Sequence, residues 1–183
     1  EQHLEIARNY VNRFNHRYGE VFPEPFAFNF NHDLVKVPSL DGEGKMSKSE
    51  NQMATLYLAD EDEAIRKKIM KAKTDSGPAE INSVKPGYIE NLFLLMKLVS
   101  TKDTLEYFEQ KFNDCSIRYG DMKKQIAEDM VQFISPIRQK VNDILNDEAY
   151  LQKVMKMGAE KAIANAEITM TEVRNAMGLN YFR

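Results

Sequence analysis

After Ser49, apolar residues recur at spacings of three and four, which restricts most of the molecule to α-helices. Leu92, Leu95, Met96 and Val99 mark one such helix, and residues 102–112 form a shorter one. The segment 74–86 between them and the preceding helix carries Gly and Pro and is expected to be a loop. The pattern therefore predicts a mainly α fold.

Two long helices are expected to close the chain. The first should be capped by Asp121 and run toward Pro136, which we expect to kink or restart the helix because proline lacks a backbone N–H. Its buried side should carry three apolar residues, Ile126, Met130 and Phe133. The second should begin near Asp147 and end at Gly178 in the left-handed conformation.

The first 37 residues have a different pattern. Residues 4–18 carry apolar side chains at helical spacing, and Gly19 should end that helix. Beyond the prolines at 23 and 25, Phe26, Phe28 and Phe30 alternate with other residues, which favours a short strand, and Val35 and Val37 indicate a second extended piece. This order is typical of the end of an α/β unit whose earlier strands are not in this chain.

A Gly-containing loop, residues 40–44, leads into the pentapeptide Lys45-Met46-Ser47-Lys48-Ser49. Two lysines three positions apart on such a loop can close over one polyphosphate from the same side, because lysine is a compact charge on a flexible stem. Ser49 followed by Gln52 indicates a capping box, so we expect a helix to start at Ser49. Its free amides would add a second attraction for phosphate.

Composition excludes several classes of protein. The chain has 183 residues, 43% hydrophobic and 29% charged, with a net charge of -3, as expected for a globular protein and not for a basic nucleic-acid coat. No apolar run approaches the roughly 18–20 residues of a membrane helix, so we expect no membrane association. Cys115 is the single cysteine, and the three histidines lack metal-ligand spacing, so we expect no metal site and a cytoplasmic location.

The pentapeptide is identical to the KMSKS signature of class I aminoacyl-tRNA synthetases. Segments along nearly the whole chain resemble the tryptophanyl-tRNA synthetases in particular. On the N-terminal side they are Gln2-His3-Leu4-Glu5, Arg13-Phe14-Asn15, Tyr18 to Pro23 and Lys71 to Asp75. Toward the C-terminus they are Lys85-Pro86-Gly87, Asn91-Leu92, Tyr119-Gly120-Asp121, Ser135 to Arg138, Gly158 to Ala162 and Gly178.

The resemblance implies ATP-dependent activation of tryptophan, with Mg²⁺ accompanying the ATP, followed by transfer to tRNA(Trp). It makes Lys45 and Lys48 the catalytic residues, which would stabilise charge on the leaving pyrophosphate. Met46 and Ser47 would contribute backbone amides, Ser49 would cap the next helix, and the backbone of Val37 would lie against the adenine. All six of these residues are expected ATP-binding residues. Related full-length enzymes are homodimers.

The resemblance also predicts the domain organisation. Residues 1–58 correspond to the end of a Rossmann-like catalytic domain, and residues 59–183 to a helical anticodon-binding domain. The HIGH-like signature of the class is absent from these 183 residues, and His3 matches only the last residue of a further nucleotide-binding motif. We therefore expect a C-terminal fragment that cannot form the aminoacyl-adenylate alone. Five basic residues could contact tRNA phosphates or form a solvated helix face, namely Arg66, Lys67, Lys68, Lys71 and Lys73.

Two alternatives remain at this level. A tyrosyl-tRNA synthetase would share the fold and the signature, although the segments after Asp75 follow the tryptophan enzyme. A non-catalytic tRNA-binding or interaction module could retain the loop as a relic. The sequence upstream of this chain, with or without a nucleotide-binding half, separates an enzyme from such a module.

Overall fold

The structure is a computed structural model that describes residues 2–28, 36–49 and 51–179. Within these ranges there are six α-helices, one short 3-10 helix and no strand beyond an isolated bridge between Pro38 and Lys45. The predicted mainly α fold is confirmed. The chain divides into two compact units, one of Glu1–Leu34 with Ile144–Arg183 and one of Val35–Asp143.

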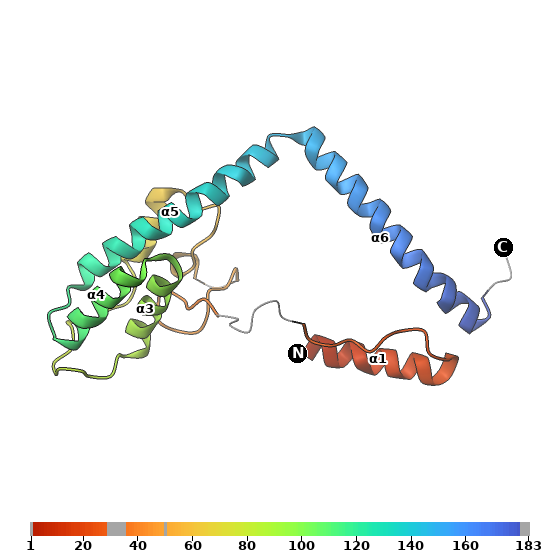
Figure 1. The fold of residues 1–183 in the computed structure, drawn as a ribbon, viewed down its shortest axis with the longest axis horizontal. Coiled ribbons are helices and arrows are strands. Elements are labelled where there is room, and N and C mark those ends of the chain that lie inside the picture. Colours follow the sequence, from red (N-terminus) through yellow and green to blue (C-terminus); the bar gives the residue numbers. More distant parts are fainter. Residues whose placement is uncertain (1, 29–35, 50, 180–183) are drawn as a thin grey trace. The chain divides into compact units, whose positions relative to one another are not determined.

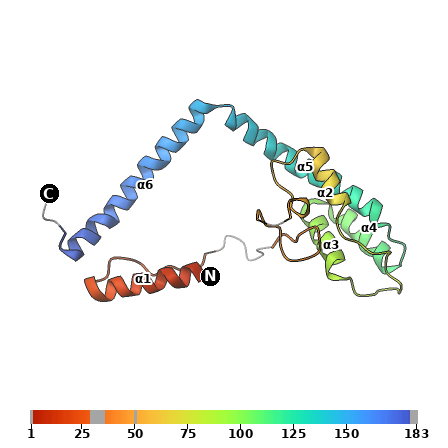
Figure 2. The same ribbon diagram turned by 180° about the vertical axis from the view of Figure 1, so that it is seen from behind.

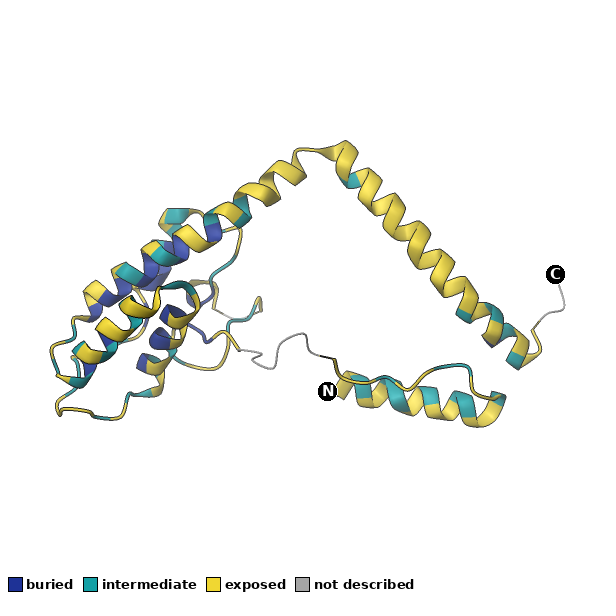
Figure 3. Ribbon diagram, viewed as in Figure 1, coloured by how far each residue is buried: buried dark blue, intermediate teal, exposed yellow. Residues whose placement is uncertain are grey.

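The second unit holds the helices α2 (Asp62–Met70), α3 (Gly87–Val99), α4 (Lys102–Asn113) and nearly all of α5 (Tyr119–Leu145) (Figure 1). These helices share one apolar core, and Figure 3 marks its buried residues as dark blue stretches of the ribbon. The largest fully buried side chains are Phe112, Ile65, Ile69, Ile89, Leu92, Leu95, Met96, Met122 and Ile126. Burial of large apolar side chains, each contributing roughly 1.5–3 kcal/mol, is the main force that assembles the unit.

The segment that precedes α2 packs on the same core. Leu40 and Ala54 are buried among the residues of the four helices, and Ala54 ends the 3-10 helix η1 (Gln52–Ala54). The Lys73 N–H, just after α2, donates to the Leu40 carbonyl at 3.1 Å. The predicted functional loop is therefore anchored to the helices on both sides.

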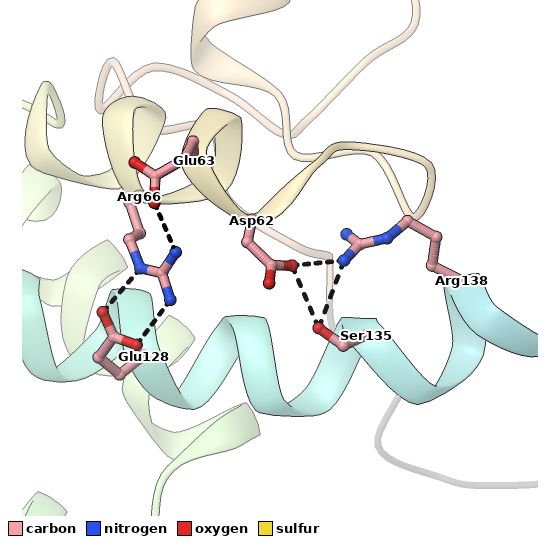
Figure 4. Close-up of polar contacts among 6 residues, drawn as sticks. All are labelled: Asp62, Glu63, Arg66, Glu128, Ser135 and Arg138. Atoms are coloured by element: carbon pink, nitrogen blue, oxygen red, sulfur yellow. Dashed lines mark hydrogen bonds and ion pairs between the residues drawn. The ribbon is translucent and has the colours of Figure 1, made fainter.

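Arg66 ties α2 to α5. Its Nε and Nη2 donate to the two carboxylate oxygens of Glu128 at 2.8 and 3.0 Å, and its Nη1 donates to Glu63 at 2.8 Å (Figure 4). Seen from behind in Figure 2, α2 runs against α5. A guanidinium that meets a carboxylate with two parallel hydrogen bonds fixes geometry more strictly than a single contact would.

A second tie lies further along α5. Arg138 donates to the Asp62 carboxylate and to the Asp60 carbonyl, and the Ser135 hydroxyl donates to the same carboxylate at 3.2 Å (Figure 4). These contacts flank Pro136, and α5 continues through the proline without restarting. Packing and polar contacts on both sides of Pro136 thus outweigh the lost backbone hydrogen bond.

These ties give a pH dependence. Hydrogen bonds from Arg66 and Arg138 hold the pKa values of Glu128 and Asp62 below their usual 4.5 and 3.8. Because both values are lowered in the folded state, the stabilisation is complete above the unfolded pKa values and is lost as pH falls through the folded ones. Urea unfolding of the chain should therefore show stability falling below about pH 4.5, with a shallower fall in Glu128→Gln.

The matched control is Glu106→Gln, which removes a carboxylate paired with Lys102 on the exposed face of α4. That substitution should leave the acid slope unchanged. An equal slope in Glu128→Gln and in the unsubstituted chain would contradict the assignment of the acid transition to the Arg66 tie.

Two expected helix boundaries and one expected buried residue need correction. No α-helix starts at Ser49: the residue that caps η1 is Asn51, whose side chain accepts the Met53 N–H at 3.0 Å, and the α-helix begins at Asp62. Asp121 does not cap α5 because the helix already begins at Tyr119. Phe133 is 53% exposed, whereas Ile126 and Met130 are buried as predicted.

The other unit contains α1 (Gln2–Tyr18), which is followed by an extended return segment. The Asn15 side chain accepts the N–H groups of Val21 and Phe22 at 3.1 Å, which holds that segment against the helix end. Gly19 has a φ of +96°, as expected of a residue that ends a helix. The strand predicted around residues 26–30 is wrong for Phe26 and Phe28, which are exposed and outside any strand. The predictions for Phe30 and Val35 lie outside the described residues.

The last helix, α6 (Glu148–Met177), matches the sequence prediction at both ends. Asp147 caps it by accepting the Tyr150 N–H at 2.9 Å, and Gly178 follows it with a φ of +71°. Most of its surface is exposed, as the yellow ribbon in Figure 3 shows. No helix among the described residues is both long and apolar enough to span a bilayer.

Candidate active site

A tight reverse turn presents the lysine-containing loop. The Met46 N–H donates to the Val37 carbonyl at 2.9 Å, and the Ser39 N–H donates to the Gly44 carbonyl at 3.3 Å. Together with the bridge between Pro38 and Lys45, these bonds pair the two arms of the turn. Residues 38–40 are buried, so one arm is fixed on the core while the other carries Lys45 outward.

Asp41 and Gly42 shape the tip of this turn. The Glu43 N–H donates to the Asp41 carboxylate at 3.1 Å, and hydrogen bonding from Ser39 and then from Glu43 lowers the pKa of Asp41. Gly42 has a φ of +87°, and a Cβ added to it would lie 2.6 Å from the Cβ of Tyr88 in α3. Asp41, one of two acidic residues beside the expected phosphate site, therefore closes the turn, and Gly42 docks it on α3.

Three of the predicted site residues lie together. Val37, Lys45 and Met46 line an open apolar cavity of about 530 Å³. Its other walls come from α3, α5 and two leucines that follow η1, Leu56 and Leu58. Val37 is 39% exposed and Lys45 is exposed, while Met46 packs partly against the core. The carbonyl of Val37 is already engaged by Met46, so its amide and side chain are the parts open to a ligand.

The remaining three predicted residues form the outer part of the loop. Lys48 and Ser49 are exposed in a turn, and the Ser49 N–H donates to the Ser47 hydroxyl at 3.4 Å. The Ser47 carbonyl accepts the Thr55 hydroxyl at 3.2 Å. The backbone is thus held at Ser47, and Lys48 projects from just beyond that point.

The basic cluster after the loop divides into two groups. Arg66, whose side chain is 32% exposed, pairs with Glu128, whereas Lys68 is only 8% exposed and pairs with Asp60. Lys73 lies over the ring of Tyr88, 5.3 Å from its centroid. Lys67 and Lys71 are exposed. The sequence left phosphate contact and a solvated helix face open for these five residues. The buried Lys68 lies on no solvated face, and Arg66 already pairs with Glu63 and Glu128.

Sequence reasoning missed the residues that support the loop, Thr55, Asp60 and Lys68. One signal was present: Lys68 occupies the core-facing position between Ile65 and Ile69 on α2, where an amphipathic helix carries an apolar residue. A charged residue at such a position must have a buried partner. Its partner could not be found from periodicity, because Asp60 lies before the helix begins.

The loop carries two lysines on a supported backbone. Two exposed lysines, three residues apart in sequence, flank a backbone that is held at Ser47. Among the described residues, no three His, Cys, Asp or Glu side chains are grouped as metal ligands. Flexible cations on a fixed backbone can follow a polyphosphate whose charge moves during a reaction.

Comparisons with known proteins identify the family of this chain. Residues 1–135 match the family described as tRNA synthetases class I (W and Y). Tryptophan--tRNA ligases of Porphyromonas gingivalis and Chlamydia caviae are 48% and 34% identical over 97% and 98% of this chain. The crystal structure of tryptophanyl-tRNA synthetase from Campylobacter jejuni, complexed with ADP and tryptophan, matches 97% of the chain with a TM-score of 0.77 and 28% identity.

The chain spans about half the length of these relatives: 54% of the Porphyromonas protein, 51% of the Chlamydia protein and 54% of the Campylobacter chain. The family match covers well over half of this chain, and the named ligases align with nearly all of it. The chain therefore belongs to the tRNA synthetases of class I (W and Y) and is a relative of the tryptophan--tRNA ligases.

Proposed function

We propose that the chain is the C-terminal part of a tryptophan--tRNA ligase, which activates tryptophan with ATP and transfers it to tRNA(Trp). The observation that carries the proposal is the exposed pair Lys45 and Lys48 on a core-anchored turn, in a chain that aligns over nearly its whole length with such ligases. The full-length enzyme below means the complete ligase that contains these residues.

The proposed chemistry requires no general base from this chain. The carboxylate of the amino acid is already a nucleophile at neutral pH, so the activation step depends on alignment and on stabilising the charge that moves onto pyrophosphate. Lys45 and Lys48 are the catalytic residues in this proposal. Mg²⁺ bound to the ATP would supply further neutralisation of its phosphates.

The other site residues have supporting roles. Val37 would meet the adenine through its amide and its exposed side chain, since its carbonyl accepts the Met46 N–H. Ser47 would offer backbone groups to the nucleotide. Ser49 would do the same, in place of the capping role that Asn51 fills. Met46, packed against the core, would fix the path of the loop.

The helical part would bind tRNA. We propose a boundary after residue 58, with residues 1–58 completing the Rossmann-like catalytic domain and residues 59–183 forming the anticodon-binding domain. Lys67 and Lys71 are exposed on and just after α2, so they are the members of the basic cluster best placed to meet phosphates. Homodimerisation of the full-length enzyme and a cytoplasmic location belong to the same proposal.

The test is amino-acid specificity. Pyrophosphate exchange and tRNA charging by the full-length enzyme should depend on tryptophan and should discriminate against tyrosine by several orders of magnitude. A preference for tyrosine would replace the proposal with a tyrosyl-tRNA synthetase. Exchange with neither amino acid would favour a non-catalytic tRNA-binding module. The 183 residues alone should show no tryptophan-dependent exchange, because they carry no HIGH-like sequence.

A further inference from the structure

A buried lysine is connected to the loop through hydrogen bonds. Lys68 on α2 is 8% exposed, and its Nζ donates to the Asp60 carboxylate at 2.6 Å and to the Thr55 carbonyl at 2.9 Å. The ammonium also lies 4.8 Å from the centroid of the Tyr57 ring. The Asp60 carboxylate accepts the Tyr57 N–H at 2.9 Å as well, which closes the turn between η1 and α2.

Thr55 connects this buried ion pair with the loop. It is 5% exposed, and its hydroxyl donates to the Ser47 carbonyl at 3.2 Å while its own carbonyl accepts from Lys68. A continuous chain of hydrogen bonds therefore runs from the Asp60 carboxylate through the Lys68 ammonium and Thr55 to the backbone of Ser47. Ser47 is the residue directly before Lys48.

The arrangement is costly for packing alone. Ile65 and Ile69, on either side of Lys68 along α2, are fully buried in the core, and an apolar residue between them would avoid desolvating a charge. The hydrogen bonds of Lys68 go to the segment that leads back to the loop. Its ammonium thus fixes the Thr55 carbonyl and the Asp60 carboxylate, which both belong to residues outside the helices.

We propose that Lys68, together with Asp60 and Thr55, is a positioning unit for the catalytic loop. This inference rests on the proposed function. The Met46 N–H is held by Val37 and the Ser47 carbonyl by Thr55, so the backbone is fixed at the two residues that precede Lys48. Loss of the Thr55 bond would leave Met46 as the last held residue and would widen the region that the Lys48 ammonium samples.

The sharpest variant is Thr55→Val, which removes the hydroxyl and keeps the branched shape. In the full-length enzyme it should lower kcat for tryptophan-dependent pyrophosphate exchange by about tenfold, because misplacing a catalytic group by about 1 Å can cost about 10²-fold and Thr55 is only one of the loop's supports. The KM for tryptophan should stay within about twofold, since no group of this unit is proposed to touch the amino acid. Thr55→Ser, which restores a hydroxyl, should recover most of the rate.

Two further variants separate positioning from general stability. Lys68→Met should lower kcat at least as far as Thr55→Val does. Arg66→Met is the matched control, because Arg66 also lies on α2 and pairs with carboxylates but contacts α5 instead of the loop segment. It should lower the melting temperature and leave kcat within about twofold at a temperature where the enzyme is folded. An equal loss of kcat in Arg66→Met would overturn the positioning role.

A readout independent of catalysis is amide hydrogen exchange in the same full-length protein. Thr55→Val should speed exchange in the peptide that spans residues 45–53, and Arg66→Met should not. If Thr55→Val changes neither the rate of amide hydrogen exchange nor kcat, the inference is refuted and the proposed function stays intact. If Thr55→Val speeds amide hydrogen exchange in a full-length protein that activates no amino acid, Thr55 does hold the loop and the proposed function is refuted.

Discussion

Replacing Lys48 with alanine in the full-length enzyme should lower kcat for tryptophan-dependent pyrophosphate exchange by about 10²–10³-fold, the usual effect of removing one preorganised group that stabilises transition-state charge. Lys45→Ala should have an effect of the same order. The reason is structural: both side chains are exposed, whereas the backbone around them is fixed by the Val37 and Thr55 hydrogen bonds. Initial rates of pyrophosphate exchange at saturating tryptophan measure the effect.

The control for charge removal is Lys97→Ala, because Lys97 is exposed in the last turn of α3. Neither loop substitution should change the melting temperature by more than about 1 °C, because exposed side chains contribute little to stability. Activity in Lys48→Ala that equals the activity in Lys97→Ala would remove the lysine from the catalytic residues.

Gly42→Ala should be among the most destabilising single substitutions in the loop region. The added Cβ would lie 2.6 Å from the Cβ of Tyr88 and 3.4 Å from its Cα, and it would have to adopt a φ of +87°. The backbone term costs roughly 1–2 kcal/mol and the clash with a helix roughly 1–3 kcal/mol, so we expect a loss of about 2–5 kcal/mol in the free energy of unfolding. Urea unfolding of the chain measures this loss.

Gly44→Ala in the same turn separates the two terms. Gly44 also has a positive φ, +67°, but a Cβ added there meets no atom within 4 Å. It should therefore show only the backbone term, roughly 1–2 kcal/mol. Equal losses at the two positions would show that the contact between the turn and α3 contributes nothing to stability.

Periodicity was sufficient to predict the helical part of the fold. The apolar spacing around Leu92 and Ile126 marked buried helix faces, and the chemistry of Asp147 and Gly178 marked both ends of α6. These features are local, because a helix satisfies its own backbone and its caps lie within a few residues. The prediction that Phe133 is buried is wrong because the apolar stripe of α5 is wider than the face that packs on the core.

The support of the loop could not be predicted in the same way. Ser49 and Asn51 both have side chains that cap helices, and the choice of Asn51 depends on where the chain bends onto the core at Ala54. The contact of Lys68 with Thr55 joins residues 13 apart, and that of Arg66 with Glu128 joins residues 62 apart. Such pairs leave no periodic signal in the sequence. Only the structure therefore distinguishes the basic residues that pair with carboxylates from those that are exposed.

The most direct test of the catalytic role of the loop is a single-turnover measurement of tryptophanyl-adenylate formation by the full-length enzyme with Lys45→Ala and Lys48→Ala combined. Transition-state stabilisation predicts that the rate of the chemical step falls by at least about 10³-fold while the Kd for ATP rises by less than about tenfold. A chemical step that keeps its rate once ATP is saturating, with the whole loss in ATP affinity, would contradict the account.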